Sequence, residues 1–478
     1  MSGSKSALVA LFALLAGCGD VSNPGDDASP PDTGSPDDAG VDVTVTPDAS
    51  DGAAQAEAEA EAEAGPTSQP WGRDIGAGYA IALAGAPTNG DIAIGITASG
   101  SNWPFANVQR FDSSGNLLSQ TTAQPGATLS VAFDFSGNLY ASFWAATSGT
   151  DFGGGPTGQG AVLVKYDANG AYQWHYGAFP LAAFQKIAVK SNGNIVIAGA
   201  NFGVEDYGGG NVTTNGYSGS GDVLLIEITP AKAFVRAKTW GGAGDQNTSN
   251  LALDSSDDIV IAGGFEGTLD FGGGVMTGPS PGSSAHNLFI AKLDPSTQYL
   301  HQLQLQSSTT GNSIQDIALD ATGNVFVCGY LGDQVNLGGK NLLSAGSGDV
   351  LLGKLDPSLG HVWSKRFGDA QSQTCAAIGV DAQGGIVIAG QYQGGLNFGL
   401  GYLPSGMPTY VARFDSSGTA LADTYTVTGY ISGVRLLATP DFAIAGTCSG
   451  SVQLGPFNFP CKAPNQGYES FVARFAPP

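Results

Sequence analysis

The sequence has few positive charges. Lys and Arg together number 18 against 41 Asp and Glu, which gives a formal net charge of -23 over 478 residues. A nucleic-acid-binding surface needs clustered Lys and Arg to neutralise phosphates, so nucleic acid is excluded as a partner. The same imbalance disfavours electrostatic docking of the chain onto anionic lipid.

Histidine is also scarce, and the motifs of familiar catalytic sites are absent. The four histidines are His175, His286, His301 and His361. None of them has a partner at metal-ligand spacing, so no metal site is predicted. The sequence shows no nucleophile elbow and no paired acid and base signature. We therefore assign no catalytic residue and no cofactor.

Glycine, in contrast, is abundant. The chain contains 73 Gly and 25 Pro, which predicts frequent turns and few long helices. Charged residues make up 12% of the chain and apolar residues 42%, a balance that favours a folded β-rich body over disorder. A chain of 478 residues exceeds one ordinary compact core. Several domains or an array of repeats are therefore expected.

Residues 1–17 have the pattern of an export signal. Lys5 is followed by the apolar stretch ALVALFALLA, which is too short to span a bilayer. The sequence LAGC at residues 15–18 resembles the bacterial lipobox. This resemblance implies cleavage before Cys18 and acylation of that residue; the alternative is an ordinary signal with a chance cysteine. Because Gly19 rather than Asp follows, it also implies lipid anchoring at the outer membrane, on the periplasmic face or the cell surface.

Residues 18–69 form an acidic segment without Lys or Arg. Nothing in this segment can bury a core, and mutual repulsion of its carboxylates favours an extended, disordered linker. The glutamates of its AEAEAEAEA run recur at i+2 and i+4, so at most a transient helix is expected. The alternative to a solvated linker is a calcium-binding tail.

Two patterns recur together after residue 70. A turn dipeptide before an apolar run begins at residues 90, 137, 193, 257, 323, 384 and 440, which are 47 to 66 residues apart. Such dipeptides beside β-branched runs mark β-hairpins. A second pattern recurs together with these dipeptides. It is an apolar stretch followed by a basic residue, an apolar residue and a turn, as in LGKLD ending at Asp356. Two patterns with a common count predict seven repeats.

Each repeat contains four short predicted strands, for example DIALD, VFVCG, DVLLGKLD and HVWSKRFG in the fifth repeat. A unit of this size cannot bury both of its faces alone, and radial stacking of such units gives a β-propeller. The pattern D-x-x-G-N-apolar-x-apolar-x-G resembles the bacterial β-propeller repeat family called SBBP. We therefore expect an all-β fold over residues 70–478, a seven-bladed β-propeller of four-stranded blades.

The two ends of the array complement each other. The seventh repeat stops soon after Phe475, at the end of its third predicted strand. The segment WGRDIG at residues 71–76 has the spacing of the fourth strand in the fifth repeat. We predict that this N-terminal strand pairs with the last blade, closes the ring and leaves no open sheet edge. The alternative is a frayed segment beside a three-stranded blade.

The segment TLDFGGG at residues 268–274 has the glycines of a phosphate-binding loop, but a phosphate loop should open a helix and none is predicted here. Its Asp-Phe-Gly motif recurs, with variations, between the second and third strands of six repeats. We therefore expect a packing role, in which the apolar residue is buried and the glycines adopt backbone angles closed to other residues.

One basic residue also recurs in most repeats. The repeated bases are Arg110, Lys165, Lys292, Lys354, Arg413 and Arg474. In the third repeat Glu227 takes the place of the base. A charge at one fixed position in each blade predicts a structural ring of ion pairs rather than a binding site.

Four cysteines remain besides Cys18. An exported protein can form disulfides, and four thiols allow three pairings. Cys448 and Cys461 flank the connection between the second and third strands of the last blade, and we predict that they pair. Cys328 and Cys375 lie on adjacent blades; they either pair with each other or remain small core thiols.

These features favour a binding or scaffold protein. We predict a monomeric, surface-anchored lipoprotein that contacts the membrane through its lipid and binds an envelope or extracellular glycan or protein. Trp103 and Trp144 follow the second strands of the first two blades and are candidate ligand contacts, with burial inside the fold as the alternative. The alternative function is a propeller enzyme, namely a hydrolase, lyase or quinone-dependent dehydrogenase. A structural adhesin shares every feature of the binding protein.

Overall fold

The computed structural model describes residues 70–98, 103–215, 220–283, 285–307, 311–404, 409–421, 425–427, 430–436, 441–448, 451–454, 457–460 and 469–475. The regular elements in these ranges are all β-strands, so this part of the chain holds no helix that could cross a bilayer. The predicted export signal and acidic linker, residues 1–69, lie outside the described residues.

Five separate sheets have four strands each. In order of pairing they are β1 (Trp71–Ala77), β36 (Glu469–Phe475), β33 (Phe442–Cys448) and β32 (Tyr430–Leu436); β10 (Ala182–Val189), β11 (Ile195–Asn201), β14 (Asp222–Ile228) and β15 (Phe234–Trp240); β16 (Gln246–Leu253), β17 (Ile259–Phe265), β20 (Asn287–Leu293) and β21 (Tyr299–Leu305); β22 (Asn312–Leu319), β23 (Val325–Leu331), β26 (Asp349–Leu355) and β27 (His361–Phe367); and β28 (Gln373–Val380), β29 (Ile386–Tyr392), β30 (Thr409–Phe414) and β31 (Tyr425–Val427).

A further sheet has eight strands. Its members are β2 (Tyr79–Gly85), β3 (Ile92–Ala98), β4 (Phe105–Phe111), β5 (Leu117–Gln120), β6 (Gln124–Phe133), β7 (Leu139–Ala145), β8 (Gly160–Tyr166) and β9 (Tyr172–Phe179). Short hairpins join the second and third strands of four sheets. They are β12 (Val204–Asp206) with β13 (Asn211–Thr213), β18 (Thr268–Leu269) with β19 (Met276–Thr277), β24 (Gln334–Val335) with β25 (Leu342–Leu343), and β34 (Ser451–Leu454) with β35 (Phe457–Pro460).

The eight-stranded sheet departs from the seven separate sheets that the repeats predict. Strand β5 has four residues and pairs with only the Gln109–Phe111 end of β4. Strand β6 has ten residues, and its first two pair with Phe105 and Ala106 at the other end of β4. The short β5 leaves part of the β4 edge open and the long β6 reaches it, so the first two repeats merge into one sheet.

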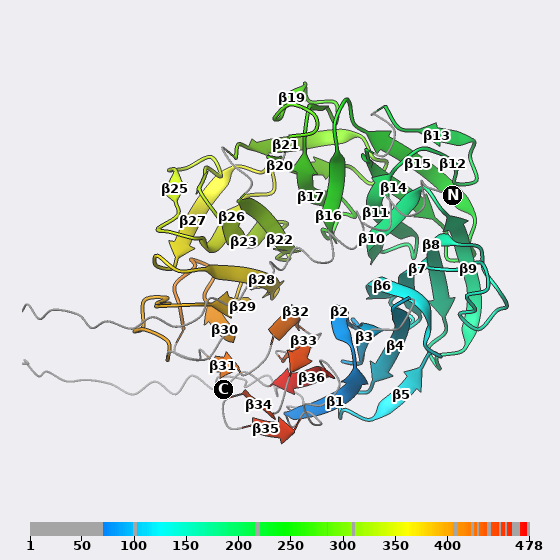
Figure 1. Cartoon of the computed structure of the whole chain (residues 1–478), viewed down its shortest axis with the longest axis horizontal. Coiled ribbons are helices and arrows are strands. Elements are labelled where there is room, and N and C mark those ends of the chain that lie inside the picture. Colours follow the sequence, from blue (N-terminus) through cyan, green and yellow to red (C-terminus); the bar gives the residue numbers. More distant parts are fainter. Residues whose placement is uncertain are drawn as a thin grey trace, which may run out of the picture. The chain divides into compact units, whose positions relative to one another are not determined.

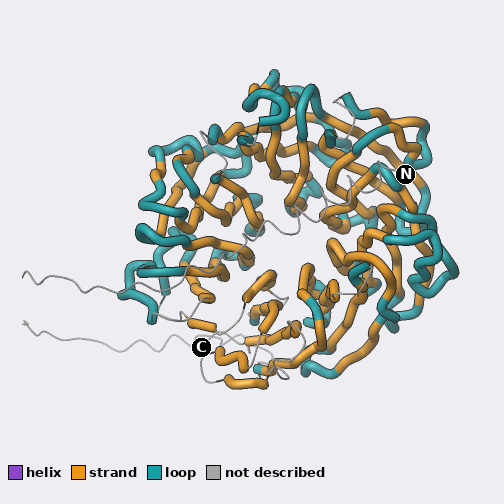
Figure 2. Tube along the Cα trace, in the orientation of Figure 1, coloured by secondary structure: helices purple, strands orange, loops and turns teal. Residues whose placement is uncertain are grey.

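The sheets follow one another around a ring. The first strand of each repeat contacts the first strand of the next, from β2 through β6, β10, β16, β22 and β28 to β32, and β32 contacts β2. Figure 1 shows the colours of the chain running around this ring, and Figure 2 shows loops gathered on its outer side. The described residues therefore form an all-β propeller with four-stranded blades.

Strand β1 closes the ring, as the sequence predicts. It pairs antiparallel with β36, with Trp71 opposite Arg474 and Ala77 opposite Glu469. The Trp71 indole Nε1 donates a hydrogen bond to the Ser113 carbonyl at 3.0 Å. Because Ser113 lies in the turn between β4 and β5, this strand ties the last sheet to the first.

The apolar second and third strands form the cores between sheets. Strand β11 is buried along its whole length, and β17, β23 and β29 are buried at all but one position. One core cluster joins Phe326 of β23 to Ile388 of β29 in the neighbouring sheet. Of the two alternatives for Cys328 and Cys375, the disulfide is the one present, and it joins the same two sheets with a Cα–Cα distance of 5.5 Å. Cys448 is also disulfide-bonded, but Cys461 lies outside the described residues.

Buried ion pairs occur where the recurrent bases predict them. Arg110 lies 2.7 Å from Asp91, Lys292 lies 2.9 Å from Asp254, Lys354 lies 3.6 Å from Asp320 and Arg474 lies 2.8 Å from Asp441. The arginines also donate to backbone carbonyls of the next repeat, Arg110 to Ala168 and Arg474 to Gly90. Lys165 donates instead to the Pro230 carbonyl of the next sheet at 3.4 Å. The ion pairs therefore brace the hairpin turns of four repeats, and the hydrogen bonds to backbone carbonyls link neighbouring repeats.

The third repeat contains the same ion pair with its charges exchanged. Lys190 occupies the turn position held by Asp254 and Asp320, and Glu227 occupies the strand position of the recurrent base. The Lys190 Nζ lies 2.9 Å from Glu227, with both side chains almost fully buried. Lys190 also donates to the Pro295 carbonyl of the next sheet at 2.7 Å. In the third, fourth and fifth repeats these two positions therefore carry opposite charges, in either order.

Exchanging the two charges tests this conclusion. Lys190→Asp alone places two carboxylates in a buried site, and we expect it to lower the free energy of unfolding by about 3–5 kcal/mol. Lys190→Asp with Glu227→Lys restores opposite charges at the two positions, as in the next two repeats, and should recover part of that loss; Arg236, which lies 3.4 Å from Glu227, would then face a second cation. Urea denaturation of both single variants and the double variant measures the coupling. Additive losses in the double variant would contradict the interpretation.

Candidate functional site

The glycine loops between second and third strands are turns, as predicted. In the loop after β18, the Asp270 carboxylate accepts hydrogen bonds from the amides of Gly272 and Gly274 at 2.7 and 3.1 Å. The backbone of Gly272 has a φ of +118°, and a methyl group on Gly273 would lie 2.2 Å from the Tyr299 ring. Phe271 is buried. The loop's own carboxylate uses the amides that a phosphate would need, so the loop is not a phosphate cradle.

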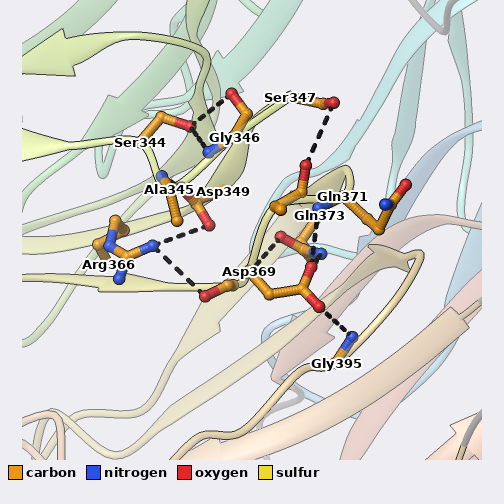
Figure 3. Close-up of polar contacts among 12 residues, drawn as sticks. Ser344, Ala345, Gly346, Ser347, Asp349, Arg366, Asp369, Gln371, Gln373 and Gly395 are labelled. Carbon is orange, nitrogen blue, oxygen red and sulfur yellow. Dashed lines mark hydrogen bonds and ion pairs between the residues drawn. The ribbon is translucent and has the colours of Figure 1, made fainter. Parts of the chain in front are cut away.

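A groove opens between the end of β27 and the connection from β29 to β30 of the next sheet. Its volume is about 360 Å³, and it is lined by Arg366, Phe367, Gly368, Asp369, Gly395, Asn397, Phe398, Gly399 and Tyr402. Figure 3 shows the hydrogen bonds that hold its polar wall. We take this groove as the candidate site because it is a concave surface that combines aromatic, amide, carboxylate and guanidinium groups.

Arg366 is held by a buried carboxylate. Its Nη1 lies 3.1 Å from Oδ1 of Asp349, whose side chain has no exposed surface. The Asp349 Oδ2 accepts a hydrogen bond from the Ala345 amide at 2.6 Å. A methyl group on Gly368 would lie 2.1 Å from Asp349 Oδ1, so only glycine allows the chain to cross over this carboxylate. About a third of the Arg366 side chain remains exposed, so the guanidinium can also meet a ligand.

Asp369 connects the two sheets across the groove. Its Oδ2 accepts a hydrogen bond from the Gly395 amide at 2.6 Å, and its Oδ1 accepts from the Gln371 amide at 2.9 Å and from Gln373 Nε2 at 2.7 Å. The Gly395 amide, with that of Gln371, lowers the pKa of Asp369 below its ordinary value. The carboxylate is therefore ionised at neutral pH and fixes the β29 to β30 connection in place.

The outer wall of the groove carries an exposed aromatic ring. Tyr402 is 75% exposed, whereas Phe398 packs beneath the groove against Phe367, with ring centroids 5.0 Å apart. The Asn397 Oδ1 accepts hydrogen bonds from the amides of Gly399 and Gly401 at 2.7 and 3.1 Å, which hold the loop between Phe398 and Tyr402. The groove therefore offers an aromatic face beside polar groups that are already positioned.

The predicted tryptophans lie elsewhere. Trp144 is buried in β7 with 4% of its surface exposed, because its strand faces the core of the first two repeats. A direct ligand contact by its indole is therefore disfavoured. Trp103, just before β4, is half-buried and remains a prediction. Cys18 lies outside the described residues.

Two histidines have structural contacts. Burial lowers the pKa of His175, whose Nδ1 lies 2.8 Å from the Tyr172 hydroxyl. His361 packs over Gly339 as Tyr172 packs over Gly154 in the second repeat. Within the described ranges no group of three or more His, Cys, Asp or Glu is placed to hold a metal ion.

The groove residues were missed because the sequence was compared repeat with repeat. Arg366 and Tyr402 come from different repeats, and neither belongs to a motif that recurs around the ring. One signal was available: an arginine at the penultimate position of β27, where β15 carries Thr239 and β21 carries Gln304. A search for departures from the repeat, rather than for the repeat itself, would have found it.

Comparisons with known proteins give only distant structural similarities. Neither the models of known protein families nor the curated proteins contain a match to this chain. Among solved structures, similar chains include Sqt1 of Chaetomium thermophilum bound to the N-terminus of ribosomal protein L10, with 13% identity over 85% of this chain and 98% of that one and a TM-score of 0.43.

Two further structures are similar at the same level. The Cps50 (Swd1) β-propeller domain of Myceliophteria thermophila is 9% identical over 84% of this chain and 98% of that one, with a TM-score of 0.45. A polysaccharide lyase, an ulvan lyase, is 10% identical over 78% of this chain and 91% of that one, also with a TM-score of 0.45. Similarities of this size carry no argument about function.

The Asp369 contacts should depend on pH. A carboxyl whose pKa is lowered by folding contributes stability above its unfolded pKa, and loses this contribution as pH falls through the folded pKa. We expect wild type to be more stable than Asp369→Asn by about 1 kcal/mol at neutral pH, because the amide cannot satisfy all three donors. The difference should shrink below about pH 4. Urea denaturation between about pH 7 and pH 3 measures it, and a constant difference would contradict the assignment.

Proposed function

We propose that this chain is a surface-anchored bacterial lipoprotein whose propeller binds an oligosaccharide in the groove between β27 and the β29 to β30 connection. The observation that carries the proposal is the exposed Tyr402 ring beside Arg366, Asp369 and Asn397 in a groove of about 360 Å³. The anchoring part rests on the sequence of residues 1–18.

The groove chemistry favours a sugar. An exposed aromatic ring can stack on the apolar face of a pyranose, and a rigid aromatic side chain loses little conformational entropy on binding. Carboxylate, amide and guanidinium groups supply the acceptors and donors that ring hydroxyls require. Asp349 holds Arg366 and backbone amides hold Asp369, so these groups are positioned before a ligand arrives. Such preorganisation reduces the entropic cost of binding.

We also propose that the propeller has seven blades of the SBBP type, with the eight-stranded sheet made of two of them. Strands β2 to β5 and β6 to β9 each follow the chain order of the separate four-stranded sheets. They join only through the two residue pairs between β4 and β6. Counted as two blades, this sheet brings the number of blades to the number of repeats in the sequence.

The anchoring proposal combines the LAGC sequence with the acidic linker. Acyl chains on Cys18 would hold the protein in the membrane, and residues 19–69 would act as a spacer to the propeller. We propose the outer membrane as the location. The chain would then present the propeller grooves to glycans of the envelope or of the surroundings.

Replacement of Cys18 tests the anchor. The wild-type chain expressed in a bacterial host should fractionate with membranes and incorporate labelled palmitate. Cys18→Ser should lose the label and appear in the soluble fraction, because one residue carries the acyl chains. Substitution of the nearby Ser22 by Ala serves as the control and should change neither result. Membrane association of Cys18→Ser without label would contradict lipid anchoring at this residue.

A glycan array with the full-length Cys18→Ser protein tests the groove. Replacing Tyr402 by Ala in this protein should weaken the glycan signal about tenfold or more, because the stacking surface is lost. Leu400 is also exposed on the same loop but does not line the groove, so Leu400→Ala should bind as the parent protein does.

Three outcomes of the array are informative. Glycan binding that survives Tyr402→Ala but is lost with Trp103→Ala would move the site to the first repeat and contradict the groove assignment. Absence of any glycan signal would contradict the proposal as a whole. Cleavage of a bound glycan during the assay would favour the propeller-enzyme alternative.

A further inference from the structure

A second groove occupies the equivalent place two sheets earlier, between β15 and the hairpin of the next sheet. Its volume is about 200 Å³, and it is lined by Asn215, Thr239, Trp240, Gly241, Thr268, Leu269, Asp270 and Val275. Strands β15 and β27 are both the fourth strands of their sheets, so Trp240 and Gly241 correspond to Phe367 and Gly368. The two grooves can therefore be compared residue by residue.

Both grooves lie over a buried aspartate. Asp222 begins β14 as Asp349 begins β26, and neither residue has exposed surface. In each, Oδ2 accepts a hydrogen bond from a backbone amide of the preceding loop, that of Asn215 at 2.9 Å and that of Ala345 at 2.6 Å. The Oδ2 atoms of the two carboxylates therefore have the same kind of partner.

The other carboxylate oxygen distinguishes the two sites. Oδ1 of Asp349 is paired with Arg366, but Oδ1 of Asp222 is buried and has no hydrogen-bond partner among the described residues. The cause is the residue at the penultimate position of the fourth strand, which is Thr239 in β15 where β27 has Arg366. Thr239 carries no charge and therefore supplies no cation at this position.

The free oxygen lies directly under the groove floor. A methyl group on Gly241 would lie 2.3 Å from Asp222 Oδ1, just as one on Gly368 would lie 2.1 Å from Asp349 Oδ1. Gly241 and Thr239 both line the groove, so the space that Arg366 fills in the fifth repeat is lined by Thr239 in the third. Burial raises the pKa of Asp222, and its charged form is stabilised in part by the Asn215 amide but opposed by nearby Asp245.

An aspartate at this position is not required by the fold. The third strands β20 and β30 begin with the uncharged Asn287 and Thr409. A buried, incompletely paired carboxylate is costly, so its presence beneath a groove favours a compensating ligand there.

We propose that the groove between β15 and the β18–β19 hairpin binds an arginine side chain of a protein partner, whose guanidinium pairs with Asp222 as Arg366 pairs with Asp349. The chain itself shows that this geometry accommodates a guanidinium. Asp270 adds a second carboxylate at the groove wall, and the net charge of -23 attracts a basic segment. This site is independent of the oligosaccharide groove, and its test does not depend on that proposal.

Matched peptides test the charge requirement. A short peptide with one arginine and its citrulline analogue, which has nearly the same shape but no charge, are titrated into the full-length Cys18→Ser protein by calorimetry. The arginine peptide should bind about tenfold or more tightly than the citrulline peptide. Equal affinities, or no heat from either peptide, would overturn the proposal.

Two variants test the location. Asp222→Asn should weaken arginine-peptide binding about tenfold or more. Thr239→Arg should abolish binding and raise the melting temperature, because it supplies from within the chain the cation that the partner would bring. Thr239→Gln, which can donate a hydrogen bond but carries no charge, is the control and should raise the melting temperature less than Thr239→Arg does. If Thr239→Arg binds the arginine peptide as wild type does, the attraction is nonspecific and the proposal fails, whether or not Asp222→Asn folds.

Discussion

Strands β11, β17 and β29 each contain the sequence IVIAG, and every residue of these runs is buried. A sheet built from such strands has two apolar faces, and water cannot be kept from both unless another sheet covers each of them. That constraint leads to the ring, in which every sheet has a neighbour on either side. It also explains why the N-terminal strand crosses to the C-terminal sheet: an incomplete last sheet would leave the pairing groups of β36 without a partner.

Buried charged side chains fix the orientation of neighbouring sheets, which apolar packing alone does not. A ring of similar sheets needs contacts that fix how each one is set against the next, and apolar packing is not directional. Several buried bases meet this need because they reach a carboxylate within their own repeat or a backbone carbonyl of the following repeat, and Arg110, Lys190 and Arg474 reach both. The inverted pair of Lys190 and Glu227 shows that either of the two positions can hold the base when the other holds the acid.

Much of the fold could be predicted because it repeats. The turn dipeptides located the hairpins, Trp71 revealed the closing strand, and recurrence of the Asp-Phe-Gly motif identified its loops as turns. Pairing between β4 and β6 could not be predicted, because it depends on the lengths of β5 and β6 rather than on a pattern. The recurring patterns could not reveal the grooves for a related reason: the grooves depend on single residues such as Arg366, Thr239 and Tyr402, and on contacts between neighbouring repeats. The sequence left both ligand contact and burial open for Trp144, because aromatic content alone does not indicate which face of a strand is covered, and the structure buries it.

The position of β1 has a mechanical consequence. Any tension on the chain that precedes residue 70 is delivered covalently to Trp71, the first residue of the strand that completes the last sheet. The first repeat shares this tension with the last sheet. The Trp71 indole and the Arg73 guanidinium donate hydrogen bonds to the carbonyls of Ser113 and Gly115 in the first repeat. Under such tension the pairing of β1 with β36 would break first, and the remaining sheets of the ring would unfold only afterwards.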